Sequence, residues 1–170
     1  MPSDAPALHQ AVIESIEHLR PWMSWIAEEP LSLEARRARI AEWEETWRRG
    51  GDVLLGVFVN DAVAGGCGLH RRRGPDTLEI GYWLHPSFVR QGLASAAGEL
   101  LTEAAFCVRG IDHVEIRHDE ANLPSGAVPT RLGYRFVGET VPDEPPTPGA
   151  VGIDHIWRLS REEWTARAST

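Results

Sequence analysis

Residues 85–101 read HPSFVRQGLASAAGELL, and this stretch decides how the rest of the chain is interpreted. The first N–H groups of any helix lack partners within the helix and lie at the positive end of its dipole. Because glycine has no Cβ, Gly92 would let an anion reach such groups, and the small Ala94 and Ser95 keep the next turn thin. The stretch therefore predicts a pyrophosphate site with Arg90 beside it, unless its small residues serve only close packing.

The composition is that of an ordinary globular protein. The chain has 170 residues, 42% hydrophobic and 25% charged, which predicts a single domain over residues 1–170 with one hydrophobic core. No apolar run is long enough for a membrane span, and no signal-peptide pattern opens the sequence. The two cysteines and the histidines show no metal-ligand spacing. We therefore expect a reduced, cytoplasmic protein without a metal or a membrane partner.

The charged residues narrow the class of partner. A net charge of −8 disfavours nucleic acid as a partner and is compatible with a cationic substrate or a basic protein. All 17 basic residues are arginine. The absence of lysine excludes a lysine nucleophile and the phosphate-binding P-loop, which requires one.

Hydrophobic spacing predicts an α+β fold with a mixed, mostly antiparallel sheet flanked by helices. The expected order is ααβββαβαββ. The helices are expected at about 4–20, 33–49, 93–109 and 123–132, and the strands at 52–59, 62–70, 77–85, 113–118, 134–141 and 153–160.

The opening stretch resembles the phosphate-binding motif [QR]-x-x-G-x-[GA] of the Gcn5-related N-acetyltransferase (GNAT) superfamily. Gly92 and Ala94 match the last two fixed positions, whereas Val89 stands where glutamine or arginine is usual. In the subgroup of ribosomal-protein alanine acetyltransferases (RimJ/RimL-like), a glycine and a basic residue or glutamine come before the fixed glycine. Here Arg90 replaces that first glycine and Gln91 follows, so the loop backbone should be less free.

Three further segments resemble the same subgroup in the same order. They are EIGYW at 79–83, NLPS at 122–125 and RLGY at 131–134. The resemblance covers residues 52–160 and divides the chain into an acceptor-side helical region (1–51), a cofactor-binding core (52–141) and a final loop, strand and tail (142–170). Relatives open with a strand before the first helix. Here that strand is reduced or missing, or the natural start lies upstream, which would leave a sheet edge differently covered.

The resemblance implies acetyl-CoA as the donor, an amine as the acceptor and direct transfer in a ternary complex. An N-terminal α-amine has a pKa of about 8, so roughly a tenth of it is neutral and nucleophilic at pH 7. We expect a protein N-terminus as the acceptor. A small amine such as an antibiotic or polyamine is the alternative, and a regulatory acyl-CoA-binding module without catalysis is the alternative of another class. A homodimer is compatible with the subgroup.

The family pattern supplies candidate site residues. Glu79 is the candidate general base, directly or through water, unless it only pairs with an arginine on a solvated sheet face. The donor carbonyl would be held by a backbone N–H around Leu84 or His85. The cofactor loop would comprise Val89, Arg90, Gln91, Gly92, Leu93, Ala94 and Ser95.

The segment at 122–125 supplies the residues expected near the thiol. Ser125 is the candidate acid for the departing thiolate, and Asn122 would contact the pantetheine, although both residues also cap helices well. Pro129 lacks an N–H, so it would leave the Ser125 carbonyl without its usual helical donor. We expect this helix to be kinked or short and that carbonyl to bond water or a ligand.

Aromatic residues suggest the acceptor pocket. Trp22, Trp25 and Tyr82 are the candidate pocket residues, because an aromatic wall suits an apolar or cationic acceptor. Trp43 and Trp47 are expected in the core instead. The run of arginines at 71–73 is interpreted as a solvated turn.

Overall fold

The computed structural model describes residues 1–167, so the last three residues of the predicted tail lie outside it. It contains five α-helices and six strands among these residues. In chain order they are α1 (Ala5–Leu19), α2 (Leu33–Arg48), β1 (Val53–Val59), β2 (Ala62–His70), β3 (Thr77–Leu84), α3 (Leu93–Cys107), β4 (His113–Asp119), α4 (Leu123–Arg131), β5 (Arg135–Thr140), β6 (Asp154–Ser160) and α5 (Arg161–Arg167).

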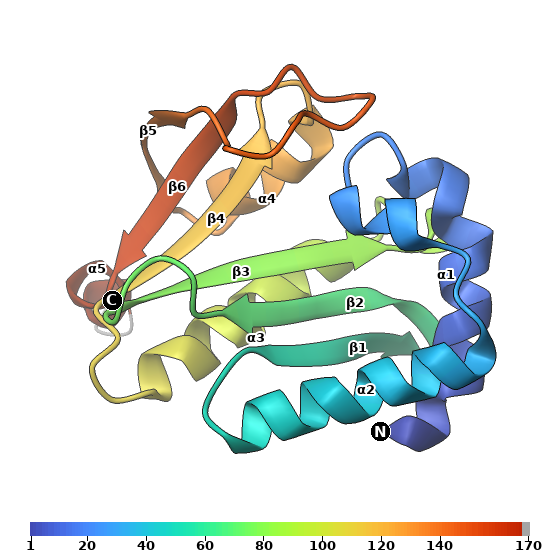
Figure 1. Ribbon diagram of the computed structural model, residues 1–170. Coiled ribbons are helices and arrows are strands. Elements are labelled where there is room, and N and C mark those ends of the chain that lie inside the picture. Colours follow the sequence, from blue (N-terminus) through green and yellow to red (C-terminus); the bar gives the residue numbers. More distant parts are fainter. Residues whose placement is uncertain (168–170) are drawn as a thin grey trace.

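The strands form one mixed sheet in the order β1-β2-β3-β4-β6-β5 (Figure 1). Every pairing is antiparallel except that of β3 with β4, which the intervening α3 makes parallel. The predicted α+β class and element order are confirmed, with α5 as an addition. No strand precedes α1 among residues 1–167, where Pro2–Asp4 form a 3₁₀ turn instead, so β1 is an edge of the sheet.

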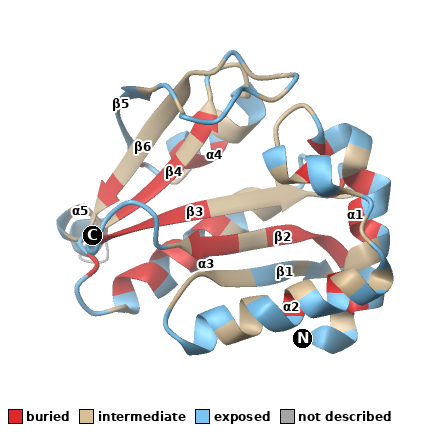
Figure 2. Ribbon diagram, viewed as in Figure 1, coloured by how far each residue is buried: buried red, intermediate tan, exposed pale blue. Residues whose placement is uncertain are grey.

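Helices cover the sheet from two sides. Figure 1 shows α3 behind the central strands and α2 in front of β1. The main core lies between α3 and β2–β4, where Figure 2 shows the buried residues concentrated. Its fully buried members include Ile80, Val114 and Ile116. One prediction fails, because Trp47 is 54% exposed rather than in the core.

Local signals explain most element ends. Ser32 caps α2 by accepting a hydrogen bond from the Ala35 N–H at 3.1 Å. Asn60 and Asp61 both have positive φ, as the tight turn between β1 and β2 requires. No helix of the described residues combines the length and apolarity needed to cross a membrane.

Candidate active site

The site begins where two central strands separate. β3 and β4 pair only over Thr77–Ile80 and His113–Ile116, and beyond these residues they diverge (Figure 1). The divergence leaves the last residues of β3 with backbone groups facing a gap. A splayed pair of parallel strands is thus a place where an extended ligand can take the position of the missing strand.

The ladder with β2 shows which β3 amides face that gap. The His85 N–H donates to the Ala64 carbonyl at 2.8 Å, so it cannot hold a donor carbonyl and that half of the prediction is wrong. Bonded and non-bonded residues alternate in an antiparallel ladder. The backbone groups of Tyr82 and Leu84 therefore point away from β2 and toward the gap, and Leu84 remains the predicted donor.

The predicted phosphate loop joins β3 to α3. Gly92 occupies the N-cap position with a φ of +80°, and no side chain caps the first turn of α3. A Cβ placed on Gly92 would have nothing within 4 Å, so the space beside the first turn is open. Leu93, Ala94 and Ser95 form that turn. The Arg90 backbone has a φ of +59°, the conformation that the subgroup's glycine would adopt without strain.

Neighbouring contacts hold the loop in place. The Gln91 amide group donates to the Ser87 carbonyl at 3.1 Å. The Arg131 guanidinium donates to Ser95 Oγ at 3.1 Å and thereby ties α4 to the start of α3. The His85 ring, which is buried, bonds Glu14 of α1 at 3.0 Å and accepts from the Ser87 N–H.

Ser125 lies across the gap from β3. Asn122 caps α4 by accepting from the Ser125 N–H at 3.3 Å, as the capping interpretation predicted. Pro129 lies inside the nine-residue α4. The Ser125 carbonyl accepts from the Tyr82 hydroxyl at 3.1 Å, a protein donor in the place where the prediction had water or a ligand.

A cavity of about 780 Å³ connects these residues to the N-terminal helices. Trp22, Trp25, Tyr82, Asn122 and Ser125 all line it, so the structure brings the predicted pocket and thiol-side residues together. Two further tryptophans line it, Trp43, which was predicted to lie in the core, and Trp83. The Trp25 and Trp83 rings lie 6.0 Å apart between centroids. Side chains alternate between the two faces of a strand, which puts Trp83 on the same face of β3 as Glu79. This alternation is the sequence signal that could have placed Trp83 in the cavity wall.

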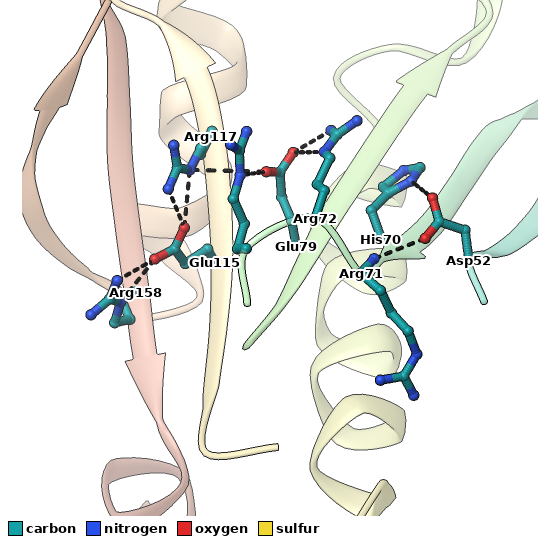
Figure 3. Close-up of polar contacts among 9 residues, drawn as sticks. Asp52, His70, Arg71, Arg72, Glu79, Glu115, Arg117 and Arg158 are labelled. Atoms are coloured by element: carbon teal, nitrogen blue, oxygen red, sulfur yellow. Dashed lines mark hydrogen bonds and ion pairs between the residues drawn. The ribbon is translucent and has the colours of Figure 1, made fainter. Parts of the chain in front are cut away.

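Glu79 lies in the cavity wall but is not a free carboxylate. Only 4% of it is exposed, and one oxygen accepts from Arg72 Nε of the β2–β3 turn at 3.1 Å (Figure 3). The other oxygen accepts from Arg73 of the same turn. All three arginines are exposed in the turn, as predicted, but Arg72 and Arg73 also bind the buried glutamate, which the prediction did not include. The Arg71 N–H donates to Asp52, which also bonds His70 (Figure 3).

A second buried glutamate extends the network. Glu115 of β4 binds Arg117 at 2.7 Å and Arg158 Nε at 2.9 Å (Figure 3). Arg117 Nε also lies 3.9 Å from Glu79, so it links the two carboxylates across the paired part of β3 and β4. No sequence signal marked this network, because its members come from separate strands.

The pKa values of two cavity carboxylates, Glu79 and Asp154, are shifted in opposite directions. Burial alone would raise the pKa of Glu79, but hydrogen bonds and charges from Arg72 and Arg73 outweigh burial and hold it below its ordinary value. Burial raises the pKa of Asp154, and the nearby charges of Asp119 and Glu79 raise it further. Asp154 lines the same cavity and was not predicted.

The loop between β5 and β6 reaches across the molecule to the N-terminal region. The Pro21 carbonyl accepts from Thr147 Oγ1 at 2.6 Å and from the Gly149 N–H at 3.0 Å. At the start of this loop, Asp143 and Glu144 line the cavity. Residues 142–152, named the strap below, therefore connect the two halves of the site.

The arrangement fits coenzyme A. Uncapped amides and open space at Gly92 suit a diphosphate, and the strand edge at Tyr82 and Leu84 suits an amide-containing chain. The cavity beyond Ser125 leaves room for an acceptor.

Comparison with known proteins agrees with this geometry. The sequence model described as "Acetyltransferase (GNAT) domain" matches residues 1–135. A protein of Bacillus subtilis (strain 168), described as "Putative ribosomal N-acetyltransferase YdaF", is 29% identical over 140 residues, which are 81% of this chain and 76% of that protein.

Solved structures share the fold. RimL, a ribosomal L7/L12 alpha-N-protein acetyltransferase in complex with coenzyme A, superposes with a TM-score of 0.85 at 24% identity, over 96% of this chain and 92% of that one. The Microcin C7 self immunity acetyltransferase MccE, in complex with acetyl-CoA and AMP, superposes with a TM-score of 0.84 at 19% identity, over 94% and 88%. The chain belongs to the GNAT acetyltransferase family and is an N-acetyltransferase.

Proposed function

We propose that the protein transfers the acetyl group of acetyl-CoA to the N-terminal α-amine of a protein, a ribosomal protein in the first instance. The observation that carries the proposal is the continuous cavity from Ser125 to the tryptophans of the N-terminal helices. Its volume of about 780 Å³ can hold the first residues of a peptide beside the strand edge. The names of the Bacillus relative and of RimL support this choice of acceptor.

The chain's own residues divide the work. Acetyl-CoA supplies the activated acetyl group. The first turn of α3 with Arg90 binds the diphosphate, and Asn122 with the Tyr82 and Leu84 backbone aligns the pantetheine. The tryptophan wall formed by Trp22, Trp25 and Trp83 desolvates the acceptor and attracts its ammonium form.

A carboxylate of the cavity then receives the amine's proton. Glu79 remains the predicted general base, but its two arginine partners lower its affinity for a proton. This makes it better suited to balancing the charge of the arginines than to accepting the amine's proton. The raised pKa of Asp154 favours that residue as the second candidate. Because an α-amine has a pKa of about 8, the base is needed most below that pH.

A panel of acceptors tests the proposal. Purified protein is incubated with acetyl-CoA and with peptides that differ only in a free or blocked N-terminus, and thiol release is followed. Turnover of free-amine peptides alone supports the proposal. Turnover of polyamines or aminoglycosides instead supports the small-amine alternative. Tight coenzyme A binding without any turnover supports the regulatory module.

A further inference from the structure

Two hydroxyl groups meet across the gap between β3 and α4. The Tyr82 hydroxyl lies 3.1 Å from the Ser125 carbonyl oxygen and 3.2 Å from Ser125 Oγ. Tyr82 is on the last part of β3, after the pairing with β4 has ended, and Ser125 is in the first turn of α4. The pair therefore closes the gap beside the strand edge expected to hold the pantetheine.

The sequence of α4 explains why the Tyr82 hydroxyl donates its hydrogen bond to the Ser125 carbonyl. In a regular helix the Ser125 carbonyl would accept from the N–H of residue 129, but that residue is Pro129. A carbonyl without a donor is costly in a part-buried place, and Tyr82 provides the donor. At the other end of the residue, Asn122 accepts from the Ser125 N–H. The Ser125 backbone is thus fixed from both sides.

This arrangement determines what the Ser125 hydroxyl can do. A phenol has one hydroxyl hydrogen. When Tyr82 donates it in a hydrogen bond to the Ser125 carbonyl, the phenol oxygen can only accept a hydrogen bond from Ser125 Oγ–H. The serine proton then rests on a neutral oxygen, which is a weaker acceptor than an anionic sulfur. A thiolate within reach would draw that hydrogen bond to itself without any rearrangement of the backbone.

We propose that Tyr82 is a positioning residue that holds Ser125 so that its hydroxyl donates a hydrogen bond to the thiolate of coenzyme A. The serine keeps its proton throughout, because an alkoxide is far more basic than a thiolate. Ser125 therefore stabilises the leaving group as a hydrogen-bond donor. The inference rests on the proposed function only in requiring coenzyme A in the cleft, and it holds for any acceptor.

The thiol pKa of bound coenzyme A tests the proposal without an acceptor. It is measured from the thiolate's ultraviolet absorbance as a function of pH, at saturating protein, for the wild type, Ser125→Ala, Tyr82→Phe and the double variant. Loss of one hydrogen bond to the anion should raise that pKa by about one unit in Ser125→Ala. Tyr82→Phe should raise it by a similar amount, and the double variant should show no further rise.

A matched control is Tyr134→Phe, which removes a hydroxyl that bonds Thr102 at 2.6 Å in the core. It should leave the thiol pKa at the wild-type value. An unchanged pKa in Tyr82→Phe, or shifts of the two variants that add in full, would overturn the positioning role. An unchanged pKa in Ser125→Ala would overturn it as well, since Ser125 would then not reach the sulfur.

A stability cycle with Pro129→Ala separates support of the fold from positioning. An alanine at 129 supplies the missing helical N–H, so Tyr82→Phe should lower the unfolding midpoint less in that background than in the wild type. The thiol pKa should stay raised in the Tyr82→Phe, Pro129→Ala variant, because Ser125 Oγ still lacks its partner. If the thiol pKa of this double variant returned to the wild-type value, Tyr82 would only support the fold and would not position Ser125.

These readouts also separate failure of the inference from failure of the proposed function. A protein that acetylates no peptide but shows the expected thiol shifts contradicts the proposed acceptor and supports the role of Tyr82. A protein that acetylates N-termini with unshifted thiol pKa values in the variants does the reverse.

Discussion

Single residues at the phosphate loop show a conflict between conformation and charge. Arg90 adopts a φ of +59°, which costs a residue with a Cβ about 1 kcal/mol relative to glycine. We expect its guanidinium to lie beside the diphosphate of bound coenzyme A. An arginine at position 90 thus strains the backbone and, in return, supplies a positive charge near the expected ligand.

Arg90→Gly should separate these two effects. Relief of strain should raise the free energy of unfolding by about 0.5 kcal/mol after the added flexibility of the unfolded chain is subtracted. Loss of the charge should weaken coenzyme A binding about threefold. Urea unfolding and calorimetric titration measure the two quantities. Arg90→Ala is the control, since it loses the charge and keeps the strain; a gain of stability in that variant would contradict the assignment.

Glu79 is expected to contribute to stability through its arginines. Glu79→Gln should lower the free energy of unfolding at pH 7 by about 2 kcal/mol, because Arg72 and Arg73 lose a buried anionic partner. The pKa of Glu79 is lowered from 4.5, so its contribution is present above that pH and is lost as the pH falls through the folded value. Urea unfolding of both proteins should show the difference shrinking in acid.

Asp154 should behave with the opposite sign. Its pKa is raised from 3.8, so the folded state binds its proton more tightly than the unfolded chain does. Stability is therefore lost as the pH rises through the folded value, and Asp154→Asn should raise the unfolding midpoint at pH 7. If Asp154 also receives the amine's proton, the same variant should lower kcat by about a hundredfold. A higher midpoint with unchanged kcat would leave Glu79 as the candidate base.

At the scale of elements, α5 is the one α-helix within residues 1–167 that sequence reasoning missed. The segment at 161–167 is too short for helical spacing to be visible. Its support comes from distant residues. Arg161 donates to the carbonyls of Phe106 at 2.7 Å and Ile111 at 2.9 Å, near the end of α3, and the Trp164 ring stacks on Phe106.

Arg161→Ala should therefore destabilise the junction of α3, β4 and α5. Orphaned carbonyls and a lost cation at the end of α3 should lower the free energy of unfolding by about 1 to 2 kcal/mol, with activity retained below the transition. Thermal unfolding measures the loss. Arg161→Lys keeps the charge without the planar fork and should recover only part of it; full recovery would show that charge alone matters.

The contrast between elements shows what a sequence can predict. Caps such as Ser32, the turn at Asn60 and Asp61 and the glycine at 92 act within a few residues, and their elements were predicted with bounds close to the observed ones. Contacts between distant residues leave no local pattern. The carboxylate network, the exposure of Trp47 and the Tyr82–Ser125 contact therefore became visible only in three dimensions.

At the scale of the whole molecule, the strap (residues 142–152) connects the C-terminal half to the N-terminal helical region. Gly149 approaches Pro21 so closely that an added Cβ would lie 2.6 Å from Pro21 Cβ and 2.9 Å from its carbonyl oxygen. The other end of the strap is held by Asp119, whose carboxylate accepts from the N–H groups of Val151 and Gly152. The end of the cavity where we propose that the acceptor binds is thus bounded by a segment remote from the predicted phosphate loop.

Gly149→Val should lift the strap from Pro21 and change the acceptor side alone. We expect the KM for a peptide acceptor to rise about tenfold, a loss of about 1.4 kcal/mol, because Asp143 and Glu144 no longer hold their places in the cavity wall. The affinity for coenzyme A should not change, because its expected contacts lie on α3, α4 and β3.

Thr147→Val removes the second bond to Pro21 and should act in the same direction more weakly. Val151→Thr, at an exposed position of the strap, is the control and should match the wild type. Steady-state kinetics with calorimetric titration of coenzyme A distinguishes the outcomes. A fall in coenzyme A affinity equal to the loss for the acceptor would show that the strap supports the whole site rather than its acceptor half.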